Sequence, residues 1–313
     1  MNRPKDIQNF SAEEMTVLLN SFDTVMTDCD GVLWFLNTPI PGALESLKTL
    51  QSLGKRVLFV SNNSFLLVED YIVKLRKMGF EATPEQIVIP SSVILWYLRK
   101  IKFQGKALVM GTMPFIKVLQ DGGIDVITSP TTLAEDYALI PALVKLDPAV
   151  RAVIFDFDAN LSWTKMYLAS LYLAQENVIY LTGALDRDLV FGKDLRLLGI
   201  GQFSDILVER TGNKPIECAK PSEQLQHYLI EKLEINDPKR CIFIGDSLSA
   251  DMKFAQSCGF KKLWVGSGLD KIESCEAQNT PMIADYYLSD LGALNSLIKK
   301  SRTNEYNQRR TQD

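Results

Sequence analysis

Short apolar runs alternate with segments of helical periodicity along most of the chain. In the helical segments apolar residues recur every three or four positions, as at residues 42–55, 68–79 and 93–100. Between them lie runs rich in Val, Ile, Leu and Phe, which we predict to be β-strands at residues 23–28, 56–63, 86–92, 106–112, 124–128, 151–158, 177–183, 241–247 and 262–268. The alternation predicts repeated strand–helix units.

The predicted strands are apolar at consecutive positions rather than at every second position. Such strands are buried on both faces, which is typical of a parallel sheet covered by helices on each side. The pattern therefore predicts an α/β fold with a doubly wound parallel sheet. From about residue 300 the sequence "KKSRTNEYNQRRTQD" loses its apolar periodicity, and we predict a mobile tail there.

Composition and charge narrow the class of protein. A chain of 313 residues with 46% hydrophobic residues is long enough for one large domain or for a core with a second unit. The net charge of -4 offers no basic surface for nucleic acid. No apolar run approaches the roughly 18 residues that cross a membrane, and the N-terminus lacks the apolar stretch of a signal peptide. The sequence predicts a cytoplasmic protein with neither a nucleic-acid nor a membrane partner.

The cysteines and the histidine exclude several kinds of site. The chain has five widely spaced cysteines without a CxxC pair, which favours free thiols in a reducing compartment over disulfides or a zinc site. The single histidine, His227, lies in an amphipathic helical pattern, where a surface or packing role is the simpler interpretation. A Ser-His-Asp hydrolase or a histidine-based metal site is therefore not expected.

Four polar segments are candidates for a site. In open α/β sheets, ligands bind beyond the carboxyl ends of the strands. Two predicted strands end in Asp28 and Asp30 of "DCDGVLW" and in "SNNS", residues 61–64, and a later one ends in "GDSLSAD", residues 245–251. Lys220 lies in "AKPS" between them. Taken alone, each segment could be a turn, a helix cap or a solvated charge; their order favours a common site.

These residue types fit phosphoryl transfer. The repulsion between Asp28 and Asp30 is relieved by a divalent cation, and hard oxygen ligands suit Mg²⁺. We expect Asp28 to attack phosphorus and Asp30 to serve as general acid and base. Phosphoryl oxygens would be held by the following residues: Gly31, Ser61, Asn62, Asn63 and Lys220. Asp28, Asp30 and Asp246 would bind the metal, with Asp251 supporting them from behind.

In this order the four segments resemble the motifs of the haloacid dehalogenase superfamily of aspartate-nucleophile phosphatases. They look most like its branch of phosphoglycolate, pyridoxal phosphate and 4-nitrophenyl phosphatases, and the resemblance extends from about Asp23 to about Leu291. It implies a Mg²⁺-dependent phosphatase of small phosphomonoesters that works through an aspartyl-phosphate. It also implies that Asp30 binds the metal through its backbone carbonyl.

The resemblance further implies a Rossmann-like core with an inserted α/β cap. We expect the core at residues 1–102 and 214–313, the cap at 103–213, and a homodimer formed through the cap. Where relatives show Thr-Asn-x-Asp, this chain has "GALD", and we expect its Asp186 to contact the leaving group. Further departures are Asn160, Ala219 and Ser249, and none of them removes a phosphoryl-transfer group. The changes in the cap, "GALD" and Asn160, put phosphoglycolate and pyridoxal phosphate in doubt as substrates.

Three alternatives stay open at this point. A phosphotransferase or phosphomutase would use the same nucleophile with a different acceptor. A catalytically silent binding protein is disfavoured by the retained Asp28, Asp30, Lys220 and Asp246. A dehalogenase would not need the metal-binding acids. The stretch "VGSGLD", residues 265–270, is interpreted as a simple turn.

Overall fold

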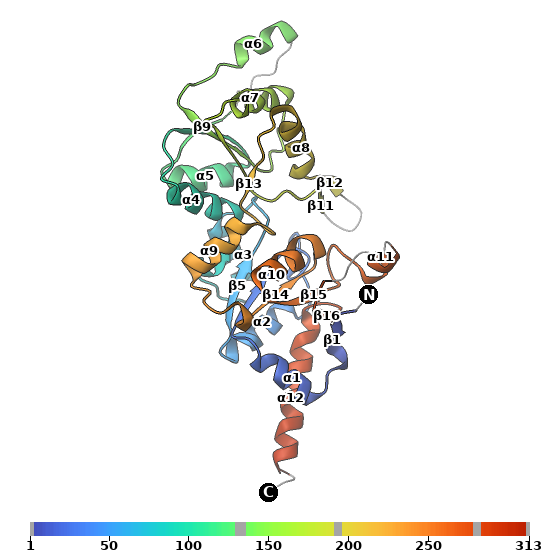
Figure 1. The fold of residues 1–313 in the computed structure, drawn as a ribbon. Helices are drawn as coiled ribbons and strands as arrows, with labels where there is room; N and C mark the ends of the chain where they lie inside the picture. The colour runs from blue at the N-terminus through green and yellow to red at the C-terminus, as the bar shows by residue number, and fades with distance from the viewer. Residues whose placement is uncertain (1–2, 129–135, 191–195, 278–282, 311–313) are drawn as a thin grey trace. The chain divides into compact units, whose positions relative to one another are not determined.

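The chain folds into two compact units, each with its own parallel sheet (Figure 1). The computed structural model describes residues 3–128, 136–190, 196–277 and 283–310. Unit 1 comprises Met1–Ser61, Tyr71–Val88 and Leu229–Asp313, and unit 2 comprises Asn62–Asp70 and Ile89–Tyr228. The predicted α/β class, a parallel main sheet with a second, inserted parallel sheet, is confirmed. Residues 103–213, the predicted cap, lie within unit 2; the exact boundaries stay a prediction.

Unit 1 is built on a parallel sheet of seven strands. Their order across the sheet is β1 (Lys5–Asp6), β16 (Tyr286–Leu288), β15 (Lys261–Val265), β14 (Cys241–Gly245), β2 (Thr24–Thr27), β5 (Arg56–Val60) and β6 (Ile87–Val88). Every residue of β14 is buried, as expected for a central strand covered on both faces. In the register, Val25 of β2 pairs with Ile242 on one side and Val57 on the other.

Helices cover both faces of this sheet. They are α1 (Ala12–Asn20), α2 (Ala43–Ser52), α10 (Lys253–Cys258) and α12 (Gly292–Arg310). Unit 1 also contains α11 (Ile272–Ala277) and short turns of helix at Ile7–Asn9, Pro84–Gln86, Pro238–Arg240 and Leu248–Met252. The chain steps from β2 to β5 toward one edge of the sheet and from β14 to β15 toward the other edge. Because such connections are right-handed crossovers, α2 and α10 lie on opposite faces. Helix α12 packs against α1 and α2. Two further helices, α3 (Val68–Lys77) and α9 (Glu223–Leu233), contain residues of both units.

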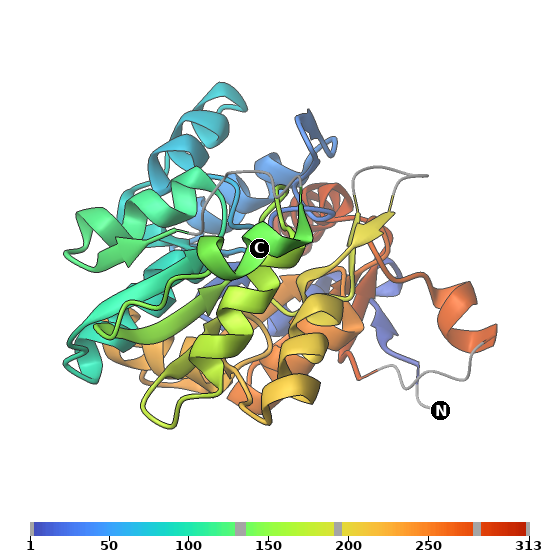
Figure 2. The ribbon, with the colours of Figure 1, turned by 90° about the horizontal axis from the view of Figure 1, so that it is seen from above.

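Unit 2 has a five-stranded parallel sheet. The order is β13 (Ile216–Glu217), β10 (Ile179–Thr182), β9 (Val150–Phe155), β7 (Lys106–Met110) and β8 (Asp125–Ile127). The helices α7 (Trp163–Leu173) and α8 (Ile200–Thr211) pack their apolar residues against one face. The helices α4 (Pro90–Lys100) and α5 (Met113–Asp121) lie on the other face (Figure 2). Short helical turns occur at Tyr137–Leu139 and at α6 (Ile140–Leu143).

Two small antiparallel pairs complete the described structure. β3 (Trp34–Phe35) pairs with β4 (Thr38–Pro39) in unit 1, and β11 (Asp188–Val190) pairs with β12 (Arg196–Leu198) in unit 2. Helix α12 continues through residue 310, so most of the segment predicted as a mobile tail is helical, and residues 311–313 lie outside the described part. Within the described ranges, no helix combines the length and the apolar character needed to cross a membrane.

Candidate functional site

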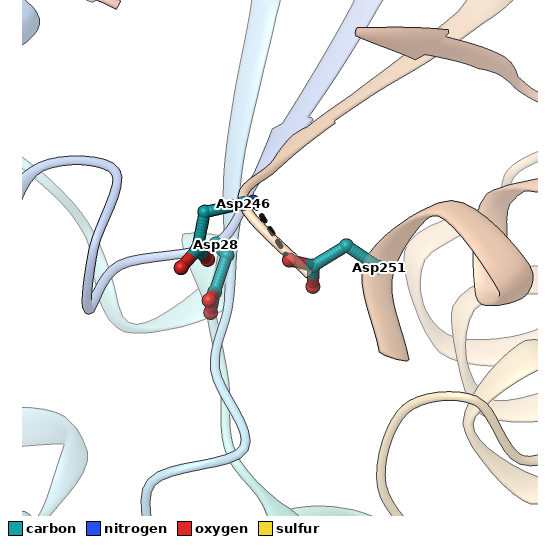
Figure 3. A group of neighbouring side chains, drawn as sticks. All are labelled: Asp28, Asp246 and Asp251. Atoms are coloured by element: carbon teal, nitrogen blue, oxygen red, sulfur yellow. Dashed lines mark hydrogen bonds between the residues drawn. The ribbon is translucent and has the colours of Figure 1, made fainter. Parts of the chain in front are cut away.

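Three aspartates gather beyond the carboxyl ends of β2 and β14 in unit 1 (Figure 3). One carboxylate oxygen from each of Asp28, Asp246 and Asp251 lies within 4.8 Å of the other two. The strands are parallel neighbours, with Thr27 opposite Ile244, so the residues that follow them emerge side by side. The backbone N–H of Asp28 continues this ladder by donating to the Ile244 carbonyl at 2.9 Å. The sheet register therefore brings together acids that are far apart in the sequence.

Asp251 is held in place by the backbone that follows β14. Its Oδ2 accepts hydrogen bonds from the backbone N–H groups of Asp246 and Ser247, both at 3.0 Å. Residues Leu248–Met252 form one turn of π-helix, a form often found at functional sites, and this turn directs the buried Asp251 side chain back toward the strand end. Asp251 thus lies where a supporting residue is expected; the role itself stays a prediction.

Asp246 is enclosed by glycines and by the segment after β15. Its Oδ2 accepts from the Leu269 N–H at 2.5 Å. Its backbone carbonyl accepts from Trp264 Nε1 and from the N–H of Asp270, both at 3.2 Å. A Cβ atom on Gly268 would lie 1.8 Å from Asp246 Oδ2, and one on Gly31 would lie 2.5 Å from it. Only glycine fits at either position.

The segment 265–270 is therefore more than the turn that the sequence suggested. Besides holding Asp246, it fixes the loop after β2, because Ser267 Oγ donates to the Gly31 carbonyl at 2.6 Å. Asp270 Oδ2 in turn accepts from the N–H of Leu248 at 2.6 Å. The sequence held a usable signal, because this segment also follows a predicted strand. In the sheet that strand, β15, lies beside β14.

The donor set fits a small divalent cation. All three side chains offer carboxylate oxygens, which Mg²⁺ prefers over nitrogen or sulfur. Ligands about 2.1 Å from an octahedral ion lie about 3 to 4 Å apart, which is compatible with three carboxylate oxygens that all lie within 4.8 Å of one another. Because two N–H groups already occupy Asp251 Oδ2, Asp28 and Asp246 are the better direct ligands. Within the described residues this is the one such group of acids, cysteines or histidines.

Asp30 and Ser61 lie in the same unit, each with a defined partner. Trp34 Nε1 donates to Asp30 Oδ1 at 3.0 Å. The hydroxyl of Tyr71 donates to Ser61 Oγ at 2.9 Å, and the Ser61 N–H donates to the Val88 carbonyl at 3.0 Å. Asp30 lies outside the group of three carboxylates, and its roles in proton transfer and metal binding stay predictions.

A second group of predicted residues lies in unit 2. Asn62 clamps the backbone of Lys220 from both sides: its Oδ1 accepts from the Lys220 N–H at 2.9 Å, and its Nδ2 donates to the Lys220 carbonyl at 3.1 Å. The same Nδ2 donates to Asp186 Oδ2 at 3.3 Å. Asn62, Lys220 and Asp186 are thus brought together within one unit. The side chain of Asn63 instead accepts from the N–H of Phe65 at 2.8 Å.

Asp156 is a buried carboxyl group that the sequence analysis missed. It follows β9, and its Oδ2 accepts from Ser64 Oγ at 3.0 Å while Oδ1 accepts from the N–H of Phe157 at 2.6 Å. Burial raises the pKa of Asp156 to about 6, a shift that these two hydrogen bonds oppose and the nearby Asp186 reinforces. The rule that selected the other strand ends would also have selected this one.

Other residues considered from the sequence lie apart from this chemistry. His227 is exposed on α9, and Asn160 and Ser249 are exposed as well. Cys29, between Asp28 and Asp30 in the sequence, is fully buried; all five cysteines are buried, and the structure joins none of them in a disulfide.

Comparisons with known proteins agree with the arrangement. Residues 25–125 match a family model described as haloacid dehalogenase-like hydrolase, and residues 217–294 match a second HAD-like model. The chain is 30% identical over 295 residues to the 4-nitrophenylphosphatase of Schizosaccharomyces pombe, covering 91% of this chain and 97% of that protein. It is 31% identical over 293 residues to phosphoglycolate phosphatase 1A, chloroplastic, of Arabidopsis thaliana, covering 92% and 80%.

Solved structures share the same fold. The 4-nitrophenylphosphatase of Thermotoga maritima superimposes with a TM-score of 0.74 at 24% identity, covering 90% of this chain and 99% of its own. A glycerol phosphate phosphatase of Mycobacterium tuberculosis, solved in complex with magnesium, gives 0.71 at 21% identity, covering 88% and 78%. The chain therefore belongs to the haloacid dehalogenase superfamily, as a phosphomonoester hydrolase of the branch that includes the 4-nitrophenylphosphatases and phosphoglycolate phosphatases.

Proposed function

We propose that the protein hydrolyses small phosphomonoesters by a Mg²⁺-dependent reaction through an aspartyl-phosphate on Asp28. The observation that carries this proposal is the convergence of Asp28, Asp246 and Asp251 at the ends of two neighbouring strands. When bound there, Mg²⁺ would offset the negative charge that the carboxylates and the substrate phosphate bring to one place.

In the first half-reaction, a carboxylate oxygen of Asp28 attacks phosphorus in line with the bond to the leaving group. The Asp28–phosphorus bond forms as the bond from phosphorus to the ester oxygen breaks, and Asp30 gives its proton to the departing alkoxide. Ser61 and Lys220 hold the remaining phosphoryl oxygens, as the motif order implies. The Asn62 side chain binds both the backbone N–H and the backbone carbonyl of Lys220, and these two bonds orient the segment that carries the lysine.

In the second half-reaction, water replaces the substrate alcohol. Asp30, now a carboxylate, accepts a proton from the attacking water, and the Asp28–phosphorus bond breaks to release inorganic phosphate. Asp30 donates a proton in the first displacement and accepts one in the second, while Asp28 carries the phosphoryl group between them, so one site serves both displacements. Asp251 keeps the backbone of Asp246 and Ser247 fixed throughout.

The substrate class follows from the relatives and from unit 2. Relatives are named for 4-nitrophenyl phosphate, phosphoglycolate and glycerol 3-phosphate, all small monoesters. The groups at the strand ends of unit 1 bind phosphate and metal and are indifferent to the rest of the substrate. We propose that the inserted segment discriminates between leaving groups, with Asp186 as a polar contact.

Two further properties belong to the same proposal. The resemblance implies a homodimer through the inserted segment, and exposed apolar side chains of unit 2, among them Trp163, Leu198 and Ile206, line one groove that a second copy could cover. We also propose a cytoplasmic location, which fits five buried cysteines that form no disulfide. Light scattering of the purified chain tests the dimer, and cell fractionation tests the compartment.

A phosphate-release screen tests the function. Purified protein is incubated with a panel of phosphorylated metabolites and 4-nitrophenyl phosphate, with Mg²⁺ and with a chelator. We expect Mg²⁺-dependent release from several monoesters, and none from the Asp28→Asn variant, because an amide is a poor nucleophile. Phosphate release by Asp28→Asn at the wild-type rate would refute the assignment of the nucleophile.

A further inference from the structure

Trp34 and Tyr71 contact two of the residues assigned to phosphoryl transfer, and Lys74 contacts Trp34. Trp34 and Tyr71 are both fully buried in unit 1, with their ring centroids 6.2 Å apart. Lys74 lies one helical turn beyond Tyr71 on α3, so both side chains share a face of the helix.

The indole of Trp34 fixes the orientation of Asp30. Its Nε1 donates to Asp30 Oδ1 at 3.0 Å, and the backbone reinforces the pairing because the N–H of Gly31 donates to the Trp34 carbonyl at 2.8 Å. A carboxyl group that transfers protons must present one oxygen to the substrate in a constant direction. A donor on Oδ1 sets the rotation of this group about its last bond.

Lys74 in turn holds the indole. Its ammonium lies 4.0 Å from the centroid of the Trp34 ring, and the same nitrogen donates a hydrogen bond to the Leu36 carbonyl. Burial lowers the pKa of Lys74, while the negative charge of Asp30 acts in the opposite direction. Lys74 therefore contacts the residue that orients Asp30 and also interacts electrostatically with Asp30 itself.

Tyr71 makes a comparable contact to Ser61. Its hydroxyl donates to Ser61 Oγ at 2.9 Å, and both side chains are buried. A serine hydroxyl that accepts at its oxygen directs its own hydrogen elsewhere. The bond from Tyr71 thereby favours a Ser61 hydroxyl that acts as a donor, which is the role that binding a phosphoryl oxygen requires.

We propose that Trp34, Lys74 and Tyr71 are positioning residues for this reaction: Trp34, steadied by Lys74, orients Asp30 for proton transfer, and Tyr71 orients Ser61 for binding phosphate. The inference rests on the proposed function, since it assumes the roles given to Asp30 and Ser61. It predicts that each positioning residue acts through its partner alone.

A double-mutant cycle tests the pair Trp34 and Asp30. Trp34→Phe keeps an aromatic ring between Tyr71 and Lys74 and removes the N–H donor. Because it removes the hydrogen bond that orients Asp30, we expect kcat for an alkyl phosphate to fall about 10- to 100-fold. The fall should be smaller for 4-nitrophenyl phosphate, whose leaving group needs little protonation. In an Asp30→Asn background the same substitution should change kcat by less than about twofold.

The chain offers a matched control for this substitution. Trp96 is also a buried tryptophan with a lysine over its ring, since Lys100 Nζ lies 4.7 Å from the centroid. Trp96→Phe should leave the ratio of alkyl to nitrophenyl rates unchanged. Lys74→Arg should keep the wild-type ratio, because it keeps a cation over Trp34, whereas Lys74→Met should move the ratio in the direction of Trp34→Phe.

A second cycle, on Tyr71 and Ser61, measures binding rather than turnover. The affinity for inorganic phosphate in the presence of Mg²⁺ is determined by calorimetry. Tyr71→Phe should weaken it about 3- to 10-fold, the value of one hydrogen bond, and should have no effect in a Ser61→Ala background. Tyr180→Phe is the control, because Tyr180 donates to Ser204 Oγ at the same 2.9 Å between buried side chains of unit 2.

The outcomes separate this inference from the proposed function. Equal losses in the presence and absence of Asp30, or of Ser61, would show that Trp34 and Tyr71 only stabilise the fold and would overturn the inference. A wild-type protein that releases no phosphate from any monoester overturns the proposed function, and the calorimetric cycle then still decides the inference: coupling between Tyr71 and Ser61 supports it, and absence of coupling or of binding refutes it.

Discussion

Replacing Gly268 with alanine should disable the metal site without disturbing the rest of the sheet. The added Cβ would lie 1.8 Å from Asp246 Oδ2, 2.3 Å from its Cγ and 2.5 Å from its Cβ. Rotating the carboxylate cannot relieve these contacts, because the Cβ of Asp246 is itself too close. The backbone of one of the two segments must move.

The size of the movement follows from ordinary contact distances. Carbon and oxygen atoms approach to about 3.3 Å without strain, so Asp246 Oδ2 and the new methyl group must separate by roughly 1.5 Å. A displacement of about 1 Å at a reacting centre can cost 10²-fold in rate. We therefore expect kcat/KM for 4-nitrophenyl phosphate to fall about 100-fold at fixed Mg²⁺. The Mg²⁺ concentration for half-maximal activity should rise, because Asp246 no longer points toward Asp28.

Mg²⁺ titrations of activity and urea unfolding curves, measured on the same preparations, check this prediction. Gly54→Ala is the control: its Cβ would meet nothing within 4 Å, but its φ of +78° strains an alanine. That variant should lose about 1 kcal/mol of stability with an unchanged Mg²⁺ titration. A wild-type Mg²⁺ titration for Gly268→Ala would refute the role given to the segment 265–270.

Two other substitutions test unit 2. Burial raises the pKa of Asp156 to about 6, so its contribution to stability is present below about pH 4 and is lost as the pH rises to about 6. Relative to Asp156→Asn, the wild-type unfolding free energy should therefore fall by up to about 3 kcal/mol over that range. Urea midpoints of both proteins from pH 4 to 7 measure this, and parallel curves would contradict it. Asp186→Ala should change relative kcat/KM values across substrates by about 1 to 3 kcal/mol and spare the Mg²⁺ requirement. One common loss for all substrates would instead mean that Asp186 acts only through Asn62 on Lys220.

The long apolar strands could be predicted from the sequence, whereas the short ones could not. β5, β9 and β14 have five or six residues each and stand out as apolar runs. β1, β13 and β16 have only two or three, too few for any periodicity to appear. They are strands because a neighbouring segment offers hydrogen bonds, as the Asp285 carbonyl before β16 does for the Lys5 N–H at 2.9 Å, and that information is not local.

The candidate site shows the same division. Asp28, Asp246 and Asp251 could be placed together because each follows or closely succeeds a strand that the sequence reveals. The bond from Ser64 to Asp156 joins residues far apart in the chain, and no pattern in either segment predicts that these two side chains meet. The Tyr71–Ser61 bond was not predicted for a different reason: Tyr71 occupies an apolar position of α3, where an aromatic ring is expected for packing alone.

The pairing of β2 with β14 has a consequence for biosynthesis. The ribosome delivers β2 and its neighbour β5 early, but Ile242, the other partner of Val25, emerges only after all of unit 2 has been made. Until then the growing chain carries an apolar strand with one open edge, the feature that favours pairing with a second nascent chain. The same unfinished chain has Asp28 without Asp246. Arrival of β14 therefore closes this open edge and, in the same event, brings Asp246 beside Asp28.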